Sequence, residues 1–172
     1  IGKVCKKRGV LFHCDAVQAA GKIPIDVRAM GIDLLSLSAH KIYGPKGVGA
    51  LFVRKTEPRV RILPLFDGGG HETGLRSGTL NVPGIVGFGK ACEIAELEMA
   101  SETERLLGLR TRLHESIASK LEEVYLNGHS TKRLAGRSTW EAIASAAVMS
   151  NESGNNASWT TSSTRFAATW PR

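Results

Sequence analysis

Short apolar runs separated by turn residues dominate the first third of the chain. Residues 10–14, 34–39 and 50–53 are mostly apolar, and each run is too short for an ordinary helix. Runs of this length between glycine-rich segments are typical of strands buried in a sheet. We therefore predict three strands, with a short helix after the first that Asp26 caps and Gly31 ends.

From Pro83 the pattern becomes helical. Leucine, isoleucine and methionine recur at roughly helical spacing between residues 94 and 121, within sequence rich in Glu, Arg and Lys. This spacing predicts one long helix or two consecutive helices, and residues 124–126 predict a further strand before a turn. Strands, loops and helices in alternation indicate an α/β architecture.

The composition changes near residue 137. Residues 137–172 contain all three Trp residues and no Lys, and Ser or Thr fills about a third of the positions. We predict no regular structure for this tail. It is either a divergent end of the protein or the product of a reading-frame change, and the sequence leaves both open.

Length and charge narrow the class of protein. The 172 residues suit one ordinary domain, and 23 Lys and Arg residues against 16 Asp and Glu give a net charge of +7. This balance favours an anionic partner such as a phosphorylated cofactor or a nucleic acid. No apolar run approaches the ~18 residues of a membrane helix, so we expect no membrane association. Three cysteines without regular spacing indicate neither a disulfide framework nor a metal site, and they favour a reducing compartment.

Polar side chains follow two of the predicted strands where each strand ends. Asp15 and Gln18 come after the first, and Ser38, His40 and Lys41 end or follow the second. In open α/β sheets this edge binds ligands. Thr79 precedes the predicted helix start, where free N–H groups favour phosphate.

These residue types suit pyridoxal 5'-phosphate. This cofactor needs an amine for its Schiff base, a carboxylate at its pyridinium nitrogen, and donors for its phenolate and phosphate oxygens. Lys41 supplies the amine, Asp15 the carboxylate and Gln18 a donor to the phenolate oxygen. The candidate phosphate-binding residues are Ser38, His40 and Thr79.

Four motifs resemble the cysteine desulfurases, which are class V aminotransferase relatives of fold type I. They are HCDAVQ at 13–18, SAHKIYGPKG at 38–47, GGGHE at 68–72 and RSGT at 76–79. The resemblance runs to about residue 136. It implies that residues 1–82 are part of a large cofactor-binding domain with a mostly parallel sheet. Residues 83–136 would then be linking helices and the start of a smaller domain, before the divergent tail at 137–172.

The resemblance also implies a reaction and its site. The family removes sulfur from L-cysteine, giving L-alanine and a persulfide on an enzyme cysteine, for iron–sulfur cluster assembly or tRNA thiolation. Lys41 would bind the cofactor covalently as the catalytic residue, with Asp15, Gln18, Ser38 and His40 around it. Thr79 would contact the cofactor of the neighbouring subunit, so the expected state is a homodimer. The expected partners are an iron–sulfur scaffold protein or another sulfur acceptor. Nucleic acid would be contacted only through partners that modify tRNA.

The chain departs from the family pattern in two places. The N-terminal half of the family and its SSGSACTS segment with the nucleophilic cysteine are not found in this sequence. We therefore expect a fragment that is inactive alone. Ser162-Ser163-Thr164-Arg165-Phe166 is similar to the Ser-Ser-Ile-Arg-Phe of the family, which implies that Arg165 binds the substrate carboxylate.

Other interpretations stay open at this point. A selenocysteine lyase or another class V enzyme would share the cofactor motifs. A non-catalytic fragment that binds a partner or nucleic acid would need only the basic charge. Residue by residue, Lys41 could be a surface lysine, Asp15 a loop acid and Thr79 a plain helix residue. The expected location is cytoplasmic, or the mitochondrial matrix in a eukaryote.

Overall fold

The computed structural model describes residues 1–56, 59–137, 140–142 and 166–168. The chain forms two compact units, residues 1–100 and 101–172, and the long helix α2 (Val82–Ala118) contributes residues to both. The domain limits expected at 82 and 136 stay predictions. In the described part of the chain, no helix has the length and apolar character needed to cross a bilayer.

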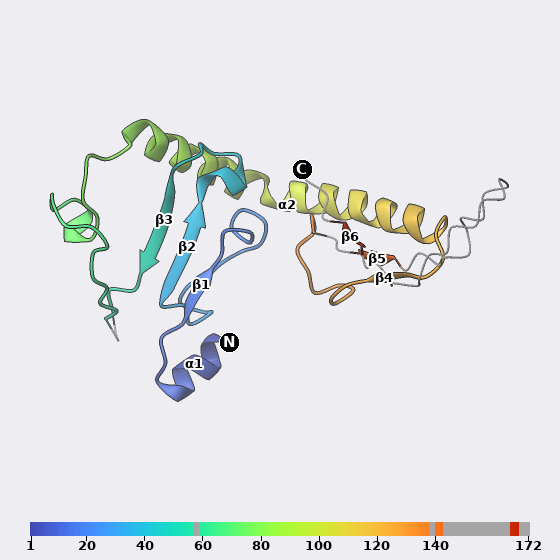
Figure 1. The fold of residues 1–172 in the computed structure, drawn as a ribbon, viewed down its shortest axis with the longest axis horizontal. Helices are drawn as coiled ribbons and strands as arrows, with labels where there is room; N and C mark the ends of the chain where they lie inside the picture. The colour runs from blue at the N-terminus through green and yellow to red at the C-terminus, as the bar shows by residue number, and fades with distance from the viewer. Residues whose placement is uncertain (57–58, 138–139, 143–165, 169–172) are drawn as a thin grey trace, which may run out of the picture. The chain divides into compact units, whose positions relative to one another are not determined.

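The first unit contains a mixed three-stranded sheet (Figure 1). Its strands are β1 (His13–Asp15), β2 (Leu34–Ser38) and β3 (Gly49–Val53), in that order across the sheet. β1 is parallel to β2, whereas β3 is antiparallel to β2. The three strands fall on the three apolar runs. A 3-10 helix, η1 (Ala39–Ile42), follows β2 directly.

One face of this sheet carries the larger buried cluster. Leu35 of β2 packs there with Ala16 and Ile32, and Cys14 and Phe52 of the neighbouring strands join them. Because side chains alternate along a strand, His13, Asp15 and Ser36 lie on the opposite face. One face of the sheet therefore carries the apolar cluster, whereas the other mixes these polar residues with Leu34 and Leu51.

A second buried cluster joins η1 to α2. Ala39 and Ile42 of η1 pack against Phe88 and Ala91 of α2, each no more than 8% exposed. Gly44 makes this close packing possible, because a Cβ at this position would lie 3.0 Å from the Ala39 Cβ. The first turns of α2 thereby hold η1 at the end of β2.

A buried ion pair fixes the other end of the sheet. The Asp33 carboxylate pairs with the Arg54 guanidinium and also accepts the Phe12 N–H at 2.8 Å. Asp33 is only 6% exposed, and a buried carboxylate needs such partners. These contacts tie the residues that precede β1 and β2 to the residue that follows β3.

The segment between β1 and β2 contains a turn where the sequence predicted a short helix. Asp26 Oδ1 accepts the N–H groups of Arg28 and Ala29 at 2.8 and 3.0 Å, and these bonds lower the pKa of Asp26. Gly31 ends the turn with φ 65°. The predicted cap and stop are therefore present, but they enclose a single turn too short to be a helix.

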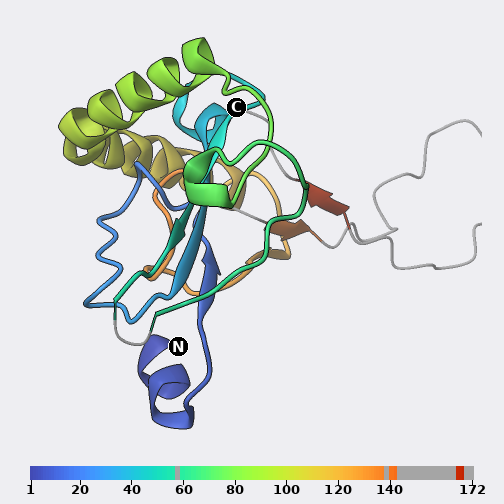
Figure 2. The ribbon, with the colours of Figure 1, turned by 90° about the vertical axis from the view of Figure 1, so that its left-hand side faces the viewer.

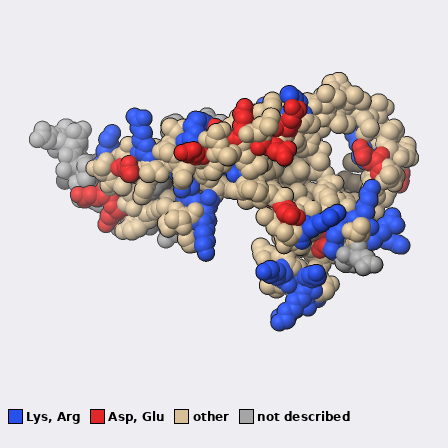
Figure 3. Space-filling model, turned by 180° about the vertical axis from the view of Figure 1, so that it is seen from behind, with Lys and Arg blue, Asp and Glu red and all other residues tan. Residues whose placement is uncertain are grey.

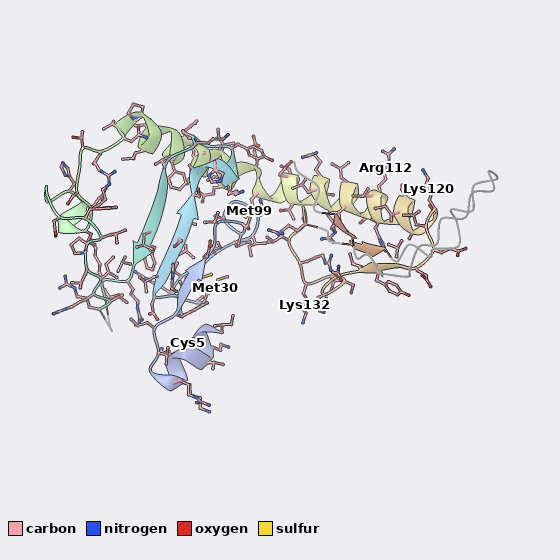
Figure 4. The ribbon with its side chains drawn as sticks, viewed as in Figure 1. Cys5, Met30, Met99, Arg112, Lys120 and Lys132 are labelled. Carbon is pink, nitrogen blue, oxygen red and sulfur yellow. The ribbon has the colours of Figure 1, made fainter. Side chains whose placement is uncertain are left out.

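The N-terminal helix α1 (Gly2–Arg8) packs on this turn through backbone contact. A Cβ on Gly2 would collide with the Met30 carbonyl, so only glycine allows the approach. Figure 4 shows Cys5 on α1 and Met30 in the turn. Basic side chains gather on α1 and after β3 (Figure 3). They are Lys3, Lys6, Lys7, Arg8, Arg54, Lys55, Arg59 and Arg61.

The described residues 54–56 and 59–81 belong to the connection between β3 and α2 and run outside the sheet, as Figures 1 and 2 show. They contain one short 3-10 helix, η2 (Glu72–Gly74). Ser77 Oγ donates to the Phe66 carbonyl at 2.9 Å, and Arg76 donates to the carbonyls of Gly78 and Thr79 at 2.8 and 3.2 Å. These bonds give the loop its own internal order.

The second unit combines the end of α2 with a small antiparallel sheet. Its strands are β4 (Val124–Leu126), β5 (Trp140–Ala142) and β6 (Phe166–Ala168). β4 matches the predicted fourth strand. β5 and β6 lie in the tail for which the sequence predicted no regular structure. The backbone of β5 pairs with β4, which the irregular apolar pattern of the tail did not indicate.

Candidate functional site

Parallel pairing of β1 and β2 brings the predicted site residues to one edge of the sheet. Asp15, the last residue of β1, is the register partner of Ser36 in β2. Ser38 ends β2 and lies two residues further on the same face. The carboxyl ends of both strands therefore meet at one edge, where α/β sheets bind ligands.

Asp15 is exposed and is held by the turn that follows it. The Val17 N–H donates to Asp15 Oδ1 at 3.0 Å, and the Ala16 N–H donates to the Ser36 carbonyl at 3.1 Å. A carboxylate has two oxygens and about four acceptor positions, so the bond from Val17 leaves acceptor capacity for another N–H. Asp15 is thus both oriented and able to bind a further donor.

Ser38, His40 and Lys41 lie at the junction of β2 and η1. Ser38 Oγ and His40 Nδ1 form a hydrogen bond at 2.8 Å. Ala39 and Ile42 are buried against α2, while His40 and Lys41 are only half-buried. The buried residues anchor η1, and the two basic side chains between them remain accessible.

Within the described residues, Lys41 is not a member of an ion pair, unlike Arg54, which pairs with Asp33, and Lys90, which pairs with Glu93. Tyr43 follows with φ 63°, and the Gly44 N–H donates to the Ala39 carbonyl at 2.9 Å. This left-handed turn follows Ile42, the last residue of η1, so Lys41 sits on a short element that ends one residue after it.

The other predicted site residues are Gln18, Thr79 and Arg165. Gln18 is half-buried in the turn after β1, three residues beyond Asp15. Thr79 is exposed on the long loop, and no hydrogen bond of the described residues joins it to Asp15, His40 or Lys41. Arg165 lies outside the described residues. The structure therefore gathers Asp15, Ser38, His40 and Lys41, with Gln18 nearby in the chain.

Two polar residues that sequence reasoning did not single out complete this face. A hydrogen bond of 2.7 Å joins His13 Nε2 to Ser36 Oγ across β1 and β2. The period of two along a strand could have identified His13, because it lies two residues before Asp15 and on the same face. The pairing register, which decides that Ser36 is its neighbour, is not visible in the sequence.

An apolar hollow of about 400 Å³ lies between the turn after β1 and α2. Ile23, Phe88, Cys92 and Met99 are among its lining residues, and Ser38 reaches it from β2. Cys92 is exposed, but partial desolvation of its thiol beside the hollow raises its pKa, so the thiolate is less favoured there. In the described part of the chain, no group of three or more His, Cys, Asp or Glu residues could hold a metal ion.

The fold and the sheet edge where β1 and β2 end define an α/β domain with a candidate lysine site at the carboxyl ends of its strands. A family model described as "Aminotransferase class-V" matches residues 1–147. The chain belongs to the class V aminotransferase family.

Curated relatives match most of the chain. "Cysteine desulfurase IscS" of Anaeromyxobacter sp. (strain Fw109-5) is 60% identical over 136 residues, which cover 79% of this chain and 33% of the relative. The protein of the same name from Rickettsia rickettsii (strain Iowa) is 57% identical over the same length. The chain thus spans about a third of the length of these relatives.

A solved structure agrees with this assignment. The X-ray structure of a NifS-like protein from Rickettsia africae ESF-5 has a TM-score of 0.77 and 33% sequence identity, covering 84% of this chain and 39% of that one. The predicted fold class, part of the large α/β domain of fold type I, is confirmed. A mostly parallel sheet and long helices were predicted, and among the described residues the first unit has a mixed sheet with one parallel and one antiparallel pair, followed by the single long helix α2.

Proposed function

We propose that this chain is the cofactor-binding part of a pyridoxal phosphate-dependent cysteine desulfurase. The proposed substrate is L-cysteine, the products are L-alanine and an enzyme persulfide, and the working state is a homodimer. The sulfur would pass to an iron–sulfur scaffold protein or to another acceptor such as a tRNA-thiolating protein. The proposed location is the cytoplasm, or the mitochondrial matrix in a eukaryote. The names of the relatives support this function.

The observation that carries the proposal is that β1 and β2 are parallel and end at one sheet edge, with Asp15 at the end of β1 and Lys41 in the helix that follows β2. Parallel pairing aligns the end of β1 with the end of β2, and η1 adds Lys41 directly beyond. A pyridine ring with an aldehyde on one side and a ring nitrogen on the other needs an amine and an acid placed around it. The residues present therefore fit pyridoxal phosphate.

When bound to an amine, this cofactor withdraws electrons and so weakens the bonds next to the amino nitrogen of the substrate. Lys41 Nζ is the amine that would hold the aldehyde carbon and move a proton at the substrate. The Asp15 carboxylate would keep the ring nitrogen protonated, and the Gln18 amide would donate to the phenolate oxygen. Such fixed donors and charges need no rearrangement during the reaction.

The phosphate end would be held by Ser38 and His40. Their mutual hydrogen bond of 2.8 Å fixes the two side chains relative to each other before any ligand arrives. Thr79 would serve the phosphate in the partner subunit, and Arg165 would bind the substrate carboxylate. Cys14 faces the buried cluster and Cys92 lies on α2, so we assign neither of them the role of sulfur acceptor.

Cofactor binding is tested directly on the full chain. We expect pyridoxal phosphate to bind, and borohydride reduction followed by peptide mass spectrometry to locate it on Lys41. The variant Lys41→Ala should lose the label. Lys46→Ala, which removes an exposed lysine five residues further on, should keep it. Labelling spread over several lysines, or unchanged in Lys41→Ala, would contradict the proposal.

The reaction is tested in a hybrid protein. Residues 1–136 replace the matching segment of the Anaeromyxobacter relative, which supplies the rest of the chain. We expect the hybrid to release alanine from L-cysteine, and its Lys41→Ala variant to release none. A hybrid that folds and binds the cofactor but prefers selenocysteine would instead favour a selenocysteine lyase.

A further inference from the structure

A second polar pair on the sheet face lies beside the carboxylate that the proposed function assigns to the cofactor ring. His13 Nε2 and Ser36 Oγ are 2.7 Å apart, and Ser36 is the register partner of Asp15. Nothing in the buried clusters requires this pair, because His13 is exposed and faces away from Cys14 and Leu35. Its place beside Asp15 suggests a role there.

Ser36 holds β1 on both sides of Asp15. Its side chain bonds to His13, two residues before Asp15, and its carbonyl accepts the N–H of Ala16, the residue after it, at 3.1 Å. β1 is only three residues long, and in the described part of the chain it pairs with β2 alone. Phe12, the residue before β1, is bonded to Asp33 and Leu34, so one end of the strand is already held. The bonds of Ser36 act at the other end, beside Asp15.

The register of β1 decides where the carboxylate lies. A slip of one residue against β2 would move Asp15 to the other face of the sheet. A slip of two residues would keep Asp15 on the same face but shift its carboxylate by roughly 6.6 Å along the strand. Either movement would take the carboxylate out of hydrogen-bond reach of a ring nitrogen held by Lys41.

We propose that the His13–Ser36 hydrogen bond is a positioning device that holds Asp15 in register for the pyridine nitrogen of the cofactor. This inference rests on the proposed function. His13 and Ser36 are positioning residues, because they act through Asp15 and need not touch the cofactor.

The test follows the ring nitrogen itself. The full chain is loaded with pyridoxal phosphate carrying an NMR-active isotope at this nitrogen, and its resonance reports whether the nitrogen is protonated. We expect Ser36→Ala and His13→Phe to shift the resonance toward the unprotonated position by similar amounts. The double variant should add nothing further, since either change breaks the same bond. Ser36→Thr, which keeps the hydroxyl, should restore the wild-type resonance.

Cys14→Ala is the matched control for general loosening of β1. It removes packing on the same strand but from the opposite face, so the resonance should not move. A second measurement needs no cofactor: the amide hydrogens of Ala16 and Val17 should exchange faster in Ser36→Ala and His13→Phe than in the wild type.

The outcomes separate the two proposals. A wild-type chain that binds no cofactor would overturn the proposed function and this inference with it. A bound cofactor whose resonance is unchanged in Ser36→Ala and His13→Phe would overturn the positioning role alone. The positioning role would also fail if Cys14→Ala moved the resonance equally, or if the amide exchange of the two variants matched the wild type.

Discussion

Two of the three cysteines, Cys14 and Cys92, lie in different surroundings, which set the chemistry of their thiols. Cys14 takes part in packing on the buried face of the sheet, whereas Cys92 borders the apolar hollow beside α2. Partial desolvation raises the pKa of the exposed Cys92, and the thiolate is the reactive form of a cysteine. Cys92 is therefore poorly suited to be a nucleophile at neutral pH.

We predict that Cys92 is alkylated more slowly when the chain is folded. With Cys5 and Cys14 replaced by Ala, iodoacetamide should modify Cys92 with a pH midpoint above that of the same variant unfolded in urea. A raised pKa means that the thiolate is scarce at neutral pH and becomes abundant only at higher pH. Equal midpoints in the folded and unfolded chain would contradict this.

At the scale of elements, α2 contains glycines in different surroundings. A Cβ on Gly87 would lie 2.7 Å from Pro45 Cγ, so this glycine lets the helix approach the loop after η1. Gly89 has nothing within 4 Å of the position of a Cβ. The two glycines lie two positions apart on one helix. An added methyl group has room at Gly89 but not at Gly87.

We predict that Gly89→Ala stabilises the chain by about 0.5–1 kcal/mol, because alanine loses less backbone freedom than glycine on entering a helix. Gly87→Ala has the same gain in propensity but forces α2 away from Pro45, so it should destabilise the chain. Urea unfolding of the two variants measures the difference. Equal stabilisation by both would show that the contact with Pro45 has no energetic weight.

At the scale of the whole molecule, the first unit depends on a few buried side chains. Phe88 is 8% exposed and joins α2 to Ala39 and Ile42, which flank the two basic residues of η1. The position of Lys41 is therefore set by packing between segments more than forty residues apart in the sequence. Site residues and core residues therefore lie next to one another within η1.

We predict that Phe88→Ala costs about 3–5 kcal/mol of stability, as other buried phenylalanine truncations do. Cofactor labelling of Lys41 should fall together with stability, because η1 loses its anchor. Val86→Ala is the control, since Val86 is 65% exposed on the same helix and its truncation should leave both quantities unchanged. Thermal unfolding and the labelling experiment measure the two effects. Full labelling of a destabilised Phe88→Ala chain would contradict the prediction, because the position of Lys41 would then not depend on the packing of Phe88.

The sequence by itself predicted β1 to β4 and the long helix, but it missed β5 and β6. Apolar runs and helical spacing are local patterns, and the four motifs make Asp15, Gln18, Ser38, His40 and Lys41 the candidate cofactor residues without coordinates. Sequence reasoning was wrong about the helix after Asp26, because a turn with a cap and a glycine stop has the same local signals as a short helix.

Only the tertiary structure decided the pairing of β1 with β2, the anchoring of η1 by Phe88 and the bond between His13 and Ser36. Each of these joins residues more than twenty positions apart in the chain. Strand register and the packing of a helix on a sheet edge depend on which distant surfaces fit together. A local pattern of residues does not predict which distant surfaces will pack together.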